Sequence, residues 1–376
     1  MRDEKIDMLR FVGLSMIILA HMGAPPWLWQ LRNFDVPLMV LASGMSFGLS
    51  YNGESYASYV WKRIKRLVFP VWLFLTAYFL LLATTGWPIP LSQAEGITRS
   101  YWLVSGYSWI IRVFLLVSLV APALWVWHRQ TRSQTRYWAL LGAIYVGYEL
   151  LRVATKPDVW SLAGEAYEST VLYLFPYAVV FVVGLHLPTL SRPQMVRLTV
   201  GAGVVWGAMA LALYAVSGHF VFTQEFKYPP SLYYLSYALG VCGVVWLAAE
   251  TLLRTVTHWG LVRPFRFVAH HSLAIYLWHM PLVDLFQVPW VVKYPCVFAG
   301  ASLLTYAQVE CVRRVLPHLI PYVNRKVLNG LFRSRVHNSS WQLTALPQRG
   351  QPFTSVGPLR GDASPTGDPP THDRAA

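Results

Sequence analysis

The feature of this sequence that most limits its fold is the repetition of long apolar runs. A segment needs about 20 mostly apolar residues to cross the hydrocarbon core of a bilayer as a helix. Such runs occur ten times, at 6–23, 34–51, 67–86, 108–127, 137–153, 170–187, 198–217, 231–250, 267–286 and 292–311. The sequence therefore predicts an all-α fold, a polytopic membrane helix bundle with about ten transmembrane helices.

The charge content agrees with this interpretation. Of the 376 residues, 55% are hydrophobic and only 13% are charged, whereas soluble domains carry about 25% charged residues. The formal net charge of +14 could indicate a nucleic-acid partner, but most basic residues lie in short clusters between the apolar runs instead of along one polar face. We therefore predict the lipid bilayer as a partner and no nucleic acid.

Lysine and arginine gather in alternate loops, and this bias sets the expected orientation. If the N-terminus is cytoplasmic, the positive-inside rule is satisfied and both termini are cytoplasmic, which requires an even number of helices. We expect a transmembrane domain over 1–320 and a cytoplasmic tail over 321–376. From about residue 337 the tail is rich in Pro, Gly, Ser, Thr and Asp, so we expect disorder there.

Polar residues inside the apolar runs mark candidate functional positions, because a charge near the bilayer centre costs about 2.5–3.5 kcal/mol on insertion scales. Arg10 and His21 lie eleven positions apart, so on a helix they project within about 20° of each other, about 16 Å apart along the axis. Asp7, three residues before Arg10, is placed to hold it. The two residues are either a functional polar stripe, or a snorkelling arginine and a histidine bonded to a neighbouring helix.

A second candidate is the basic cluster that precedes the third apolar run, Lys62, Arg63, Lys65 and Arg66. Arg63 and Arg66 share a helix face, and a guanidinium group fits phosphate oxygens better than a point charge does. Four cations in five residues exceed what orientation requires. We interpret the cluster as a phosphate-binding site, with an ordinary positive-inside flank as the alternative.

Other polar residues allow two interpretations each. Asp35 begins the second run, where it caps a helix N-terminus or orients the His21 imidazole. Ser43, beside Gly44, permits close helix approach or contacts substrate. Tyr276 and His279 share one face of the ninth run. They either line the same cavity as His21 and bind substrate there, or belong to the core. No metal site is expected.

For one further charged residue, Glu149, we prefer a structural role. Glu149 has Arg152 three positions later, and Arg112 is a candidate partner from another helix at a similar depth. We predict an ion pair that supports the bundle.

Taken together, these motifs resemble those of the membrane acyltransferase 3 family over about residues 1–320. The resemblance is carried by Asp7-x-x-Arg10, Arg10-x10-His21, the 34–44 segment, Arg63-x-x-Arg66 and the 272–281 segment. It implies that His21 is the catalytic base and that Arg10, Arg63 and Arg66 handle the acyl-CoA donor.

Members of that family O-acylate sugars of lipopolysaccharide, capsule, peptidoglycan or secreted glycans. The resemblance therefore implies an O-acetyltransferase type of enzyme in the plasma (bacterial inner) membrane. It would move an acyl group, acetyl by default, from cytoplasmic acyl-CoA to a hydroxyl of a glycan or other acceptor at the outer side. Acyl-CoA is then a co-substrate, and no permanently bound cofactor is expected.

The alternative function is a secondary transporter or lipid-linked glycan exporter without acyl-transfer chemistry. Ten helices with intramembrane His, Arg and Glu fit such a protein. We find no inverted repeat in the sequence, and the basic cluster at 62–66 has no obvious use in proton-coupled transport.

Overall fold

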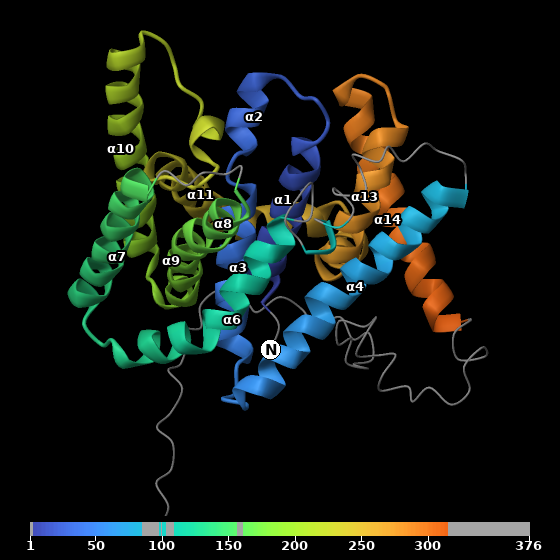
Figure 1. Ribbon diagram of the computed structural model, residues 1–376, viewed down its shortest axis with the longest axis horizontal. Coiled ribbons are helices and arrows are strands. Elements are labelled where there is room, and N and C mark those ends of the chain that lie inside the picture. The colour runs from blue at the N-terminus through green and yellow to red at the C-terminus, as the bar shows by residue number, and fades with distance from the viewer. Residues whose placement is uncertain (1–2, 85–97, 99, 103–108, 156–160, 315–376) are drawn as a thin grey trace, which may run out of the picture. The chain divides into compact units, whose positions relative to one another are not determined.

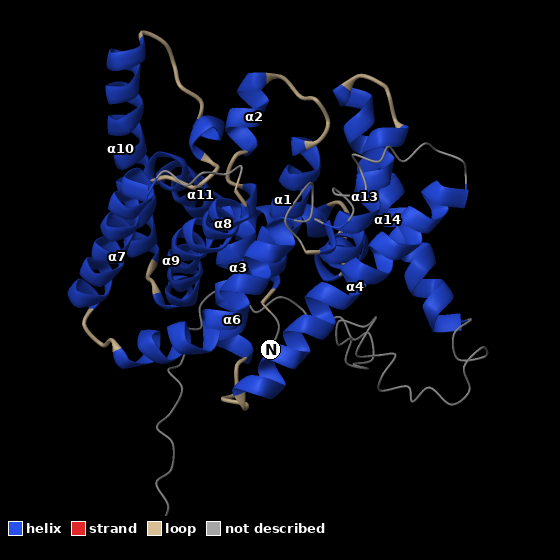
Figure 2. Cartoon of the chain, in the orientation of Figure 1, coloured by secondary structure: helices blue, strands red, loops and turns tan. Residues whose placement is uncertain are grey.

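The computed structural model describes residues 3–84, 98, 100–102, 109–155 and 161–314, which lie within one unit, Met1–Arg335 (Figure 1). Over this part of the chain the regular structure is helical, apart from one isolated bridge between Lys227 and Pro230 (Figure 2). The predicted all-α class is confirmed. The predicted tail at 321–376 lies outside the described residues.

Most of the described residues lie in helices. In order they are α1 (Glu4–Ala20), α2 (Pro26–Arg32), α3 (Asp35–Ser50), α4 (Tyr56–Thr84), α6 (Trp109–Gln130), α7 (Gln134–Thr155), α8 (Leu162–Tyr167), the π-helical turn η2 (Glu168–Leu172), α9 (Tyr173–His186), the 3₁₀ turn η3 (Leu187–Thr189), α10 (Arg192–Ser217), the 3₁₀ turn η4 (Thr223–Phe226), α11 (Leu232–His258), α12 (Val262–His270), α13 (Ser272–Leu285) and α14 (Trp290–Arg314).

Within the described part of the chain, six helical segments are long and apolar enough to cross a membrane, so the chain is a multi-pass membrane protein. They are Tyr56–Thr84, Trp109–Gln130, Ala163–Thr189, Arg192–Ser217, Leu232–His258 and Trp290–Arg314. Each of the ten predicted runs overlaps a helix, but α1, α3 and α13 have only 17, 16 and 14 residues. The count of about ten spans and the cytoplasmic location of both termini stay predictions.

Helix α1 lies inside the bundle. It packs against α2, α3, α11, α12, α13 and α14, and Leu9, Leu14 and Ile18 are almost completely buried. Figure 1 shows α1 and α3 between α10 on one side and α14 on the other. Because neighbours surround α1, its polar side chains face other helices.

The contact between α3 and α9 is made by two glycines. A Cβ atom added at Gly44 would meet the Phe181 carbonyl, and one at Gly184 would meet the Leu41 carbonyl, both nearer than the 3.0 Å that real Cβ atoms keep. The backbones of the two helices therefore touch. This confirms the packing role expected of the small residue Gly44.

The ion pair expected at Glu149 is present. Arg152 Nη2 lies 2.8 Å from Glu149 Oε2, and the other carboxylate oxygen of Glu149 accepts the backbone N–H of Leu232 at the first turn of α11. A carboxylate is favoured at a helix N-terminus. Glu149 thus joins α7 to α11, which agrees with the predicted structural role.

Candidate active site

Two histidines from opposite ends of the sequence meet in the bundle. His21 is the C-cap of α1 and His279 lies in α13. His279 Nε2 and His21 Nδ1 are 3.0 Å apart, and the ring centroids are separated by 5.1 Å. His279 is fully buried and His21 is half-buried. The structure thus joins the predicted base to one of the predicted substrate-binding residues.

Tyr276 supports His279 from one helical turn before it. Its backbone carbonyl oxygen contacts His279 Nδ1, and its ring lies 5.0 Å from the His279 ring. Tyr276 is 4% exposed, so the two side chains are held together in the core. The shared face expected for Tyr276 and His279 is confirmed.

Arg10 connects α1 to α3. Its Nη1 donates to Asp7 Oδ1 at 3.0 Å, as the spacing predicted, and its Nη2 donates to Ser46 Oγ at 2.5 Å. The Arg10 side chain is 27% exposed. Ser43 donates its hydroxyl hydrogen to the Met39 carbonyl in its own helix. Its predicted role as a substrate contact stays a prediction.

Asp35 is the centre of a buried charge cluster. Its carboxylate accepts from Arg32 Nη1 at 2.7 Å, from Lys227 Nζ at 3.2 Å and from the backbone N–H of Val36 at 2.8 Å. The three charged side chains are each 2–4% exposed. All three also act electrostatically on His21. Two cations and one carboxylate are thus buried near the histidine pair.

Lys227 lies in the loop between α10 and α11, over the rings of Tyr228 and Tyr234. Burial lowers the pKa of Lys227 to about 8, and the charge of Asp35 opposes that shift. Asp35 therefore neutralises buried cations in this structure. Its predicted role in orienting His21 stays a prediction.

At the end of α3 opposite Asp35, Arg63 of α4 lies over an aromatic cluster. Its guanidinium carbon is 4.9 Å from the Tyr59 ring centroid and 5.9 Å from that of Phe47. Tyr51 stacks on Phe47 at 4.7 Å and packs edge-on against Trp125 at 5.3 Å. No described carboxylate forms an ion pair with Arg63. The charge of Glu54 acts on Arg63 without forming an ion pair, because Glu54 itself pairs with Lys62.

The other cations of this region differ in their surroundings. Arg66 is exposed, Lys62 pairs with Glu54, and Arg129 covers the face of Trp125 at 5.3 Å. The pKa of Glu54 is lowered, chiefly by its hydrogen bond with Lys62. Arg63 and Arg129 therefore both flank the aromatic cluster.

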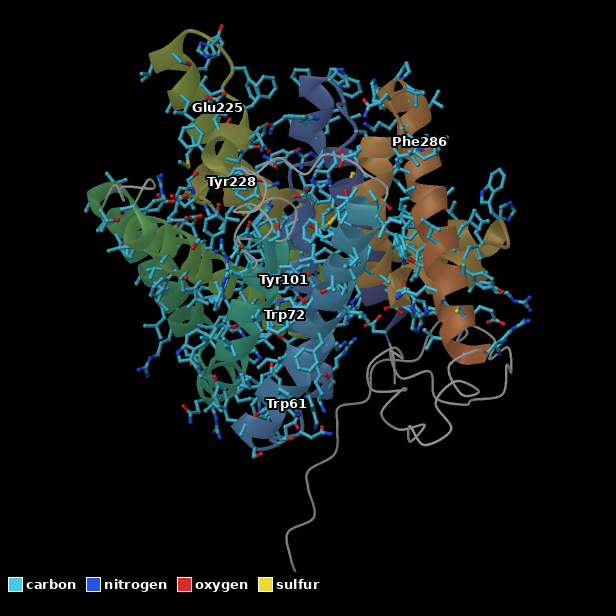
Figure 3. The ribbon with its side chains drawn as sticks, turned by 45° about the vertical axis from the view of Figure 1, so that its right-hand side comes forward. Trp61, Trp72, Tyr101, Glu225, Tyr228 and Phe286 are labelled. Atoms are coloured by element: carbon cyan, nitrogen blue, oxygen red, sulfur yellow. The ribbon has the colours of Figure 1, made fainter. Side chains whose placement is uncertain are left out.

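The two candidate sites lie toward opposite ends of the bundle. Helices α1 and α3 run in opposite directions (Figure 1), with His21 at the end of α1 and Ser46 and Phe47 near the end of α3. Arg10 bonds Ser46 and Arg63 covers Phe47, so both arginines meet α3 at adjacent residues. Figure 3 likewise places Trp61, near the start of α4, far from Tyr228 in the loop before α11.

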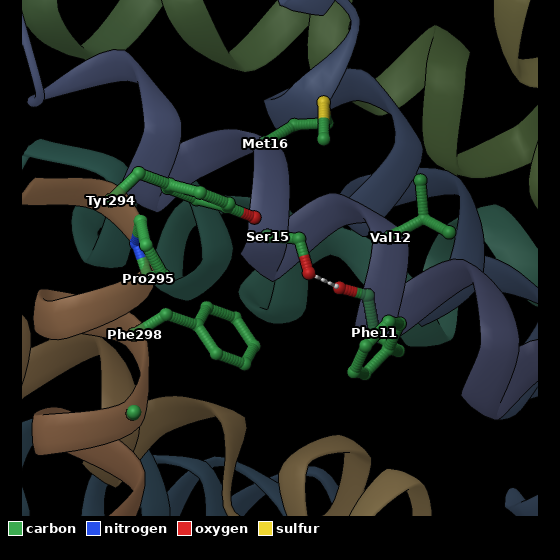
Figure 4. Close-up of a pocket in the computed structure, with 8 residues that line it drawn as sticks. Phe11, Val12, Ser15, Met16, Tyr294, Pro295 and Phe298 are labelled. Atoms are coloured by element: carbon green, nitrogen blue, oxygen red, sulfur yellow. Dashed lines mark hydrogen bonds between the residues drawn. The ribbon is translucent and has the colours of Figure 1, made fainter. Parts of the chain in front are cut away.

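An apolar crevice of about 450 Å³ is lined by residues of α1 and α14 (Figure 4). On α1 it is lined by Phe11, Val12, Ser15 and Met16. At 100° per residue, Ser15 projects about 140° away from Arg10, so the crevice is not on the stripe that carries Arg10 and His21. A channel that joins those two residues stays a prediction.

The fold and the histidine pair define a multi-pass membrane protein with a buried basic site. A family model described as an acyltransferase domain matches residues 3–307. The chain therefore belongs to the acyltransferase 3 family, as its motifs indicated, and is a membrane acyltransferase of that family. No curated protein and no solved structure is significantly similar to it.

Two residues of the site region, Arg32 and Lys227, were not identified from the sequence as candidates. Both looked like ordinary loop cations between apolar runs. The spacing of Arg32, three residues before Asp35, is the one local signal that could have indicated the first ion pair. The burial of Lys227 depends on how the loop after α10 folds. No local sequence pattern predicts that burial.

Proposed function

We propose that this protein transfers an acyl group, acetyl by default, from cytoplasmic acyl-CoA to a hydroxyl of a glycan or other acceptor at the outer side of the plasma membrane of a bacterium. The observation that carries the proposal is the hydrogen bond between His21 and the buried His279, in a chain of this family. Such an imidazole has the chemistry of a general base.

The donor binds at the end of the bundle where Arg10 and Arg63 meet α3, with Arg66 one turn further along α4. Guanidinium groups make charge-assisted hydrogen bonds with phosphate oxygens, and acyl-CoA carries its phosphates at the end opposite its thioester. Arg63 meets this need best, because Glu54, the carboxylate whose charge acts on it, forms its ion pair with Lys62 instead. The pantetheine arm then extends along α1 from Arg10 toward His21, over about 16 Å of helix axis.

The chemical step joins donor and acceptor at His21. The imidazole takes the proton of the acceptor hydroxyl while the oxygen attacks the thioester carbonyl. The carbon–sulfur bond of the resulting intermediate then breaks, and the imidazolium returns the proton to the leaving thiolate of CoA. General base catalysis supplies about 10²–10⁴-fold, so alignment of the two substrates provides much of the remaining acceleration.

Purified protein in sealed vesicles tests the proposal against transport. Acetyl-CoA labelled in its acetyl group is supplied on one side and a candidate glycan on the other. We expect free CoA thiol to appear together with labelled, acylated glycan. Uptake of the glycan without release of thiol would contradict the proposal and would indicate a transporter or exporter.

The acceptor can be identified from intact cells. Mass spectrometry of surface glycans with and without this protein should show a mass difference of one acyl group, which would report both acceptor and acyl chain. Identical glycan masses, with thiol release intact in vesicles, would contradict a glycan acceptor and favour another hydroxyl compound.

A further inference from the structure

We infer that His279 is a positioning residue that fixes the tautomer of His21, so that His21 carries its proton on Nδ1 and its lone pair on Nε2. This inference rests on the proposed function, in which His21 is the base. It assigns His279 to His21 and not to the substrate, which differs from the role that the sequence predicted.

A contact within α13 fixes where His279 carries its proton. His279 Nδ1 faces the backbone carbonyl oxygen of Tyr276. A carbonyl oxygen only accepts hydrogen bonds, so Nδ1 of His279 must be the donor and must carry a hydrogen. The contact comes from the helix of His279 itself and from two residues that are both buried, so it holds the ring in one orientation.

The protonation of His279 then fixes the protonation of His21. A neutral ring has one N–H, and the other nitrogen is an acceptor. With Nδ1 protonated, Nε2 of His279 accepts, and the atom 3.0 Å away is His21 Nδ1. His21 Nδ1 must therefore be the donor, which leaves the lone pair of His21 on Nε2.

The direction of this chain of hydrogen bonds suits a base. When His21 Nε2 takes a proton from the acceptor hydroxyl, the ring becomes an imidazolium whose Nδ1–H already points at the lone pair of His279. His279 thus stabilises the charge that develops on His21 while it neither gains nor loses a proton itself. A carboxylate plays this part in other acid–base sites; here the nearby carboxylate, Asp35, pairs with Arg32 and Lys227.

The direct test is nitrogen NMR of the full-length protein in detergent micelles or lipid, with histidine labelled at both ring nitrogens. The His21 signals are assigned by their loss in His21→Ala. We expect His21 Nδ1 to be protonated and Nε2 unprotonated at neutral pH, and we expect His279→Leu to shift His21 toward the Nε2–H form. A wild-type His21 with its proton on Nε2 would overturn the inference.

A pair of variants gives the kinetic test. In His279→Gln the amide oxygen can still accept from His21 Nδ1–H, whereas His279→Leu offers no acceptor. We expect His279→Leu to lower kcat by about 10–100-fold with little change in the KM for acyl-CoA, and His279→Gln to recover much of that loss. Equal kcat in the two variants, when both elute as folded protein, would contradict the inference.

The two proposals fail in different ways. If the tautomer is wrong while His21→Ala abolishes transfer, only the inference fails. If the tautomer is as expected and no acyl transfer occurs, the proposed function fails and the hydrogen-bond arrangement stands.

Discussion

At the scale of single residues, the site region contains charges that are costly to keep buried. Arg32, Asp35 and Lys227 are almost fully buried and include one more cation than carboxylate. Removing one partner of a buried ion pair leaves an uncompensated charge, which is much more costly than losing a surface pair. The stability of this part of the bundle therefore depends strongly on the single carboxylate of Asp35.

We expect Asp35→Asn to destabilise the purified protein by about 3–5 kcal/mol, because two buried cations then lack a carboxylate. Lys227→Met should be milder, since it leaves the Arg32–Asp35 pair balanced. Denaturant unfolding followed by tryptophan fluorescence measures both. Glu310→Gln, which breaks an exposed pair with Arg313, is the matched control and should leave unfolding unchanged. Equal losses for Asp35→Asn and Glu310→Gln would refute this account of Asp35.

The donor site makes a second prediction about single residues. Arg63→Gln should raise the KM for acyl-CoA about tenfold or more, because a hydrogen bond to a charged group contributes about 1.5–3 kcal/mol. Its kcat should change less, since Arg63 lies far from His21. Arg254→Gln removes an exposed arginine of α11 and serves as the control for a change of net charge. A KM equal to that of Arg254→Gln would argue against phosphate binding by Arg63.

At the scale of helices, close approach of α3 and α9 fixes the position of the segment that carries both Asp35 and Ser46. Gly44 and Gly184 each face a carbonyl of the other helix. A side chain on either glycine forces the helices apart, and overpacking of this kind costs about 1–3 kcal/mol. The contacts of α3 with α1 and α2 would then shift as well.

Gly44→Ala should therefore lower the unfolding temperature and reduce acyl transfer together. Gly142→Ala is the control, because a Cβ atom at Gly142 of α7 meets nothing within 4 Å; it should be neutral or slightly stabilising, since alanine favours the helix over glycine. Thermal unfolding in detergent measures both variants. The account of the α3–α9 contact would be wrong if Gly44→Ala were as stable as Gly142→Ala.

The sequence predicts helices better than it predicts which helices meet. The length of the apolar runs located a helix at every predicted span, and periodicity placed Tyr276 and His279 on one face. The short helices α2 and α8 and the 3₁₀ turn η4 were missed. So was the break at His271, where the expected single span at 267–286 divides into α12 and α13. These features depend on backbone geometry outside a regular apolar pattern.

The pairing of His21 with His279 could be predicted only as a possibility, because the two residues are 258 positions apart. Helical periodicity describes one helix at a time, and the bond between them depends on the packing of α1 against α13. The burial of Lys227 is missed for the same reason. Local charge spacing, by contrast, correctly predicted the contacts of Arg10 with Asp7 and of Arg152 with Glu149.

At the scale of the whole molecule, transfer from cytoplasmic acyl-CoA to an outer acceptor requires the two ends of the bundle to face different compartments. We predict that a cysteine at Ser133, between α6 and α7, is labelled by a membrane-impermeant maleimide only after cells are opened, and that one at His219, after α10, is labelled in intact cells. Both positions are exposed. Cys242, Cys296 and Cys311 are first replaced by serine. The opposite labelling pattern would contradict the predicted orientation of the protein and the proposed direction of acyl transfer.

The most direct test of the central claim, that the His21 imidazole is the base for acyl transfer, is the kcat of His21→Ala in vesicles. His219→Ala, which removes an exposed histidine from a loop, is measured beside it. We predict that His21→Ala loses about 10²–10⁴-fold in kcat while it still binds acyl-CoA, and that His219→Ala matches the wild type. A folded His21→Ala variant that transfers acyl groups at the wild-type rate would contradict the claim.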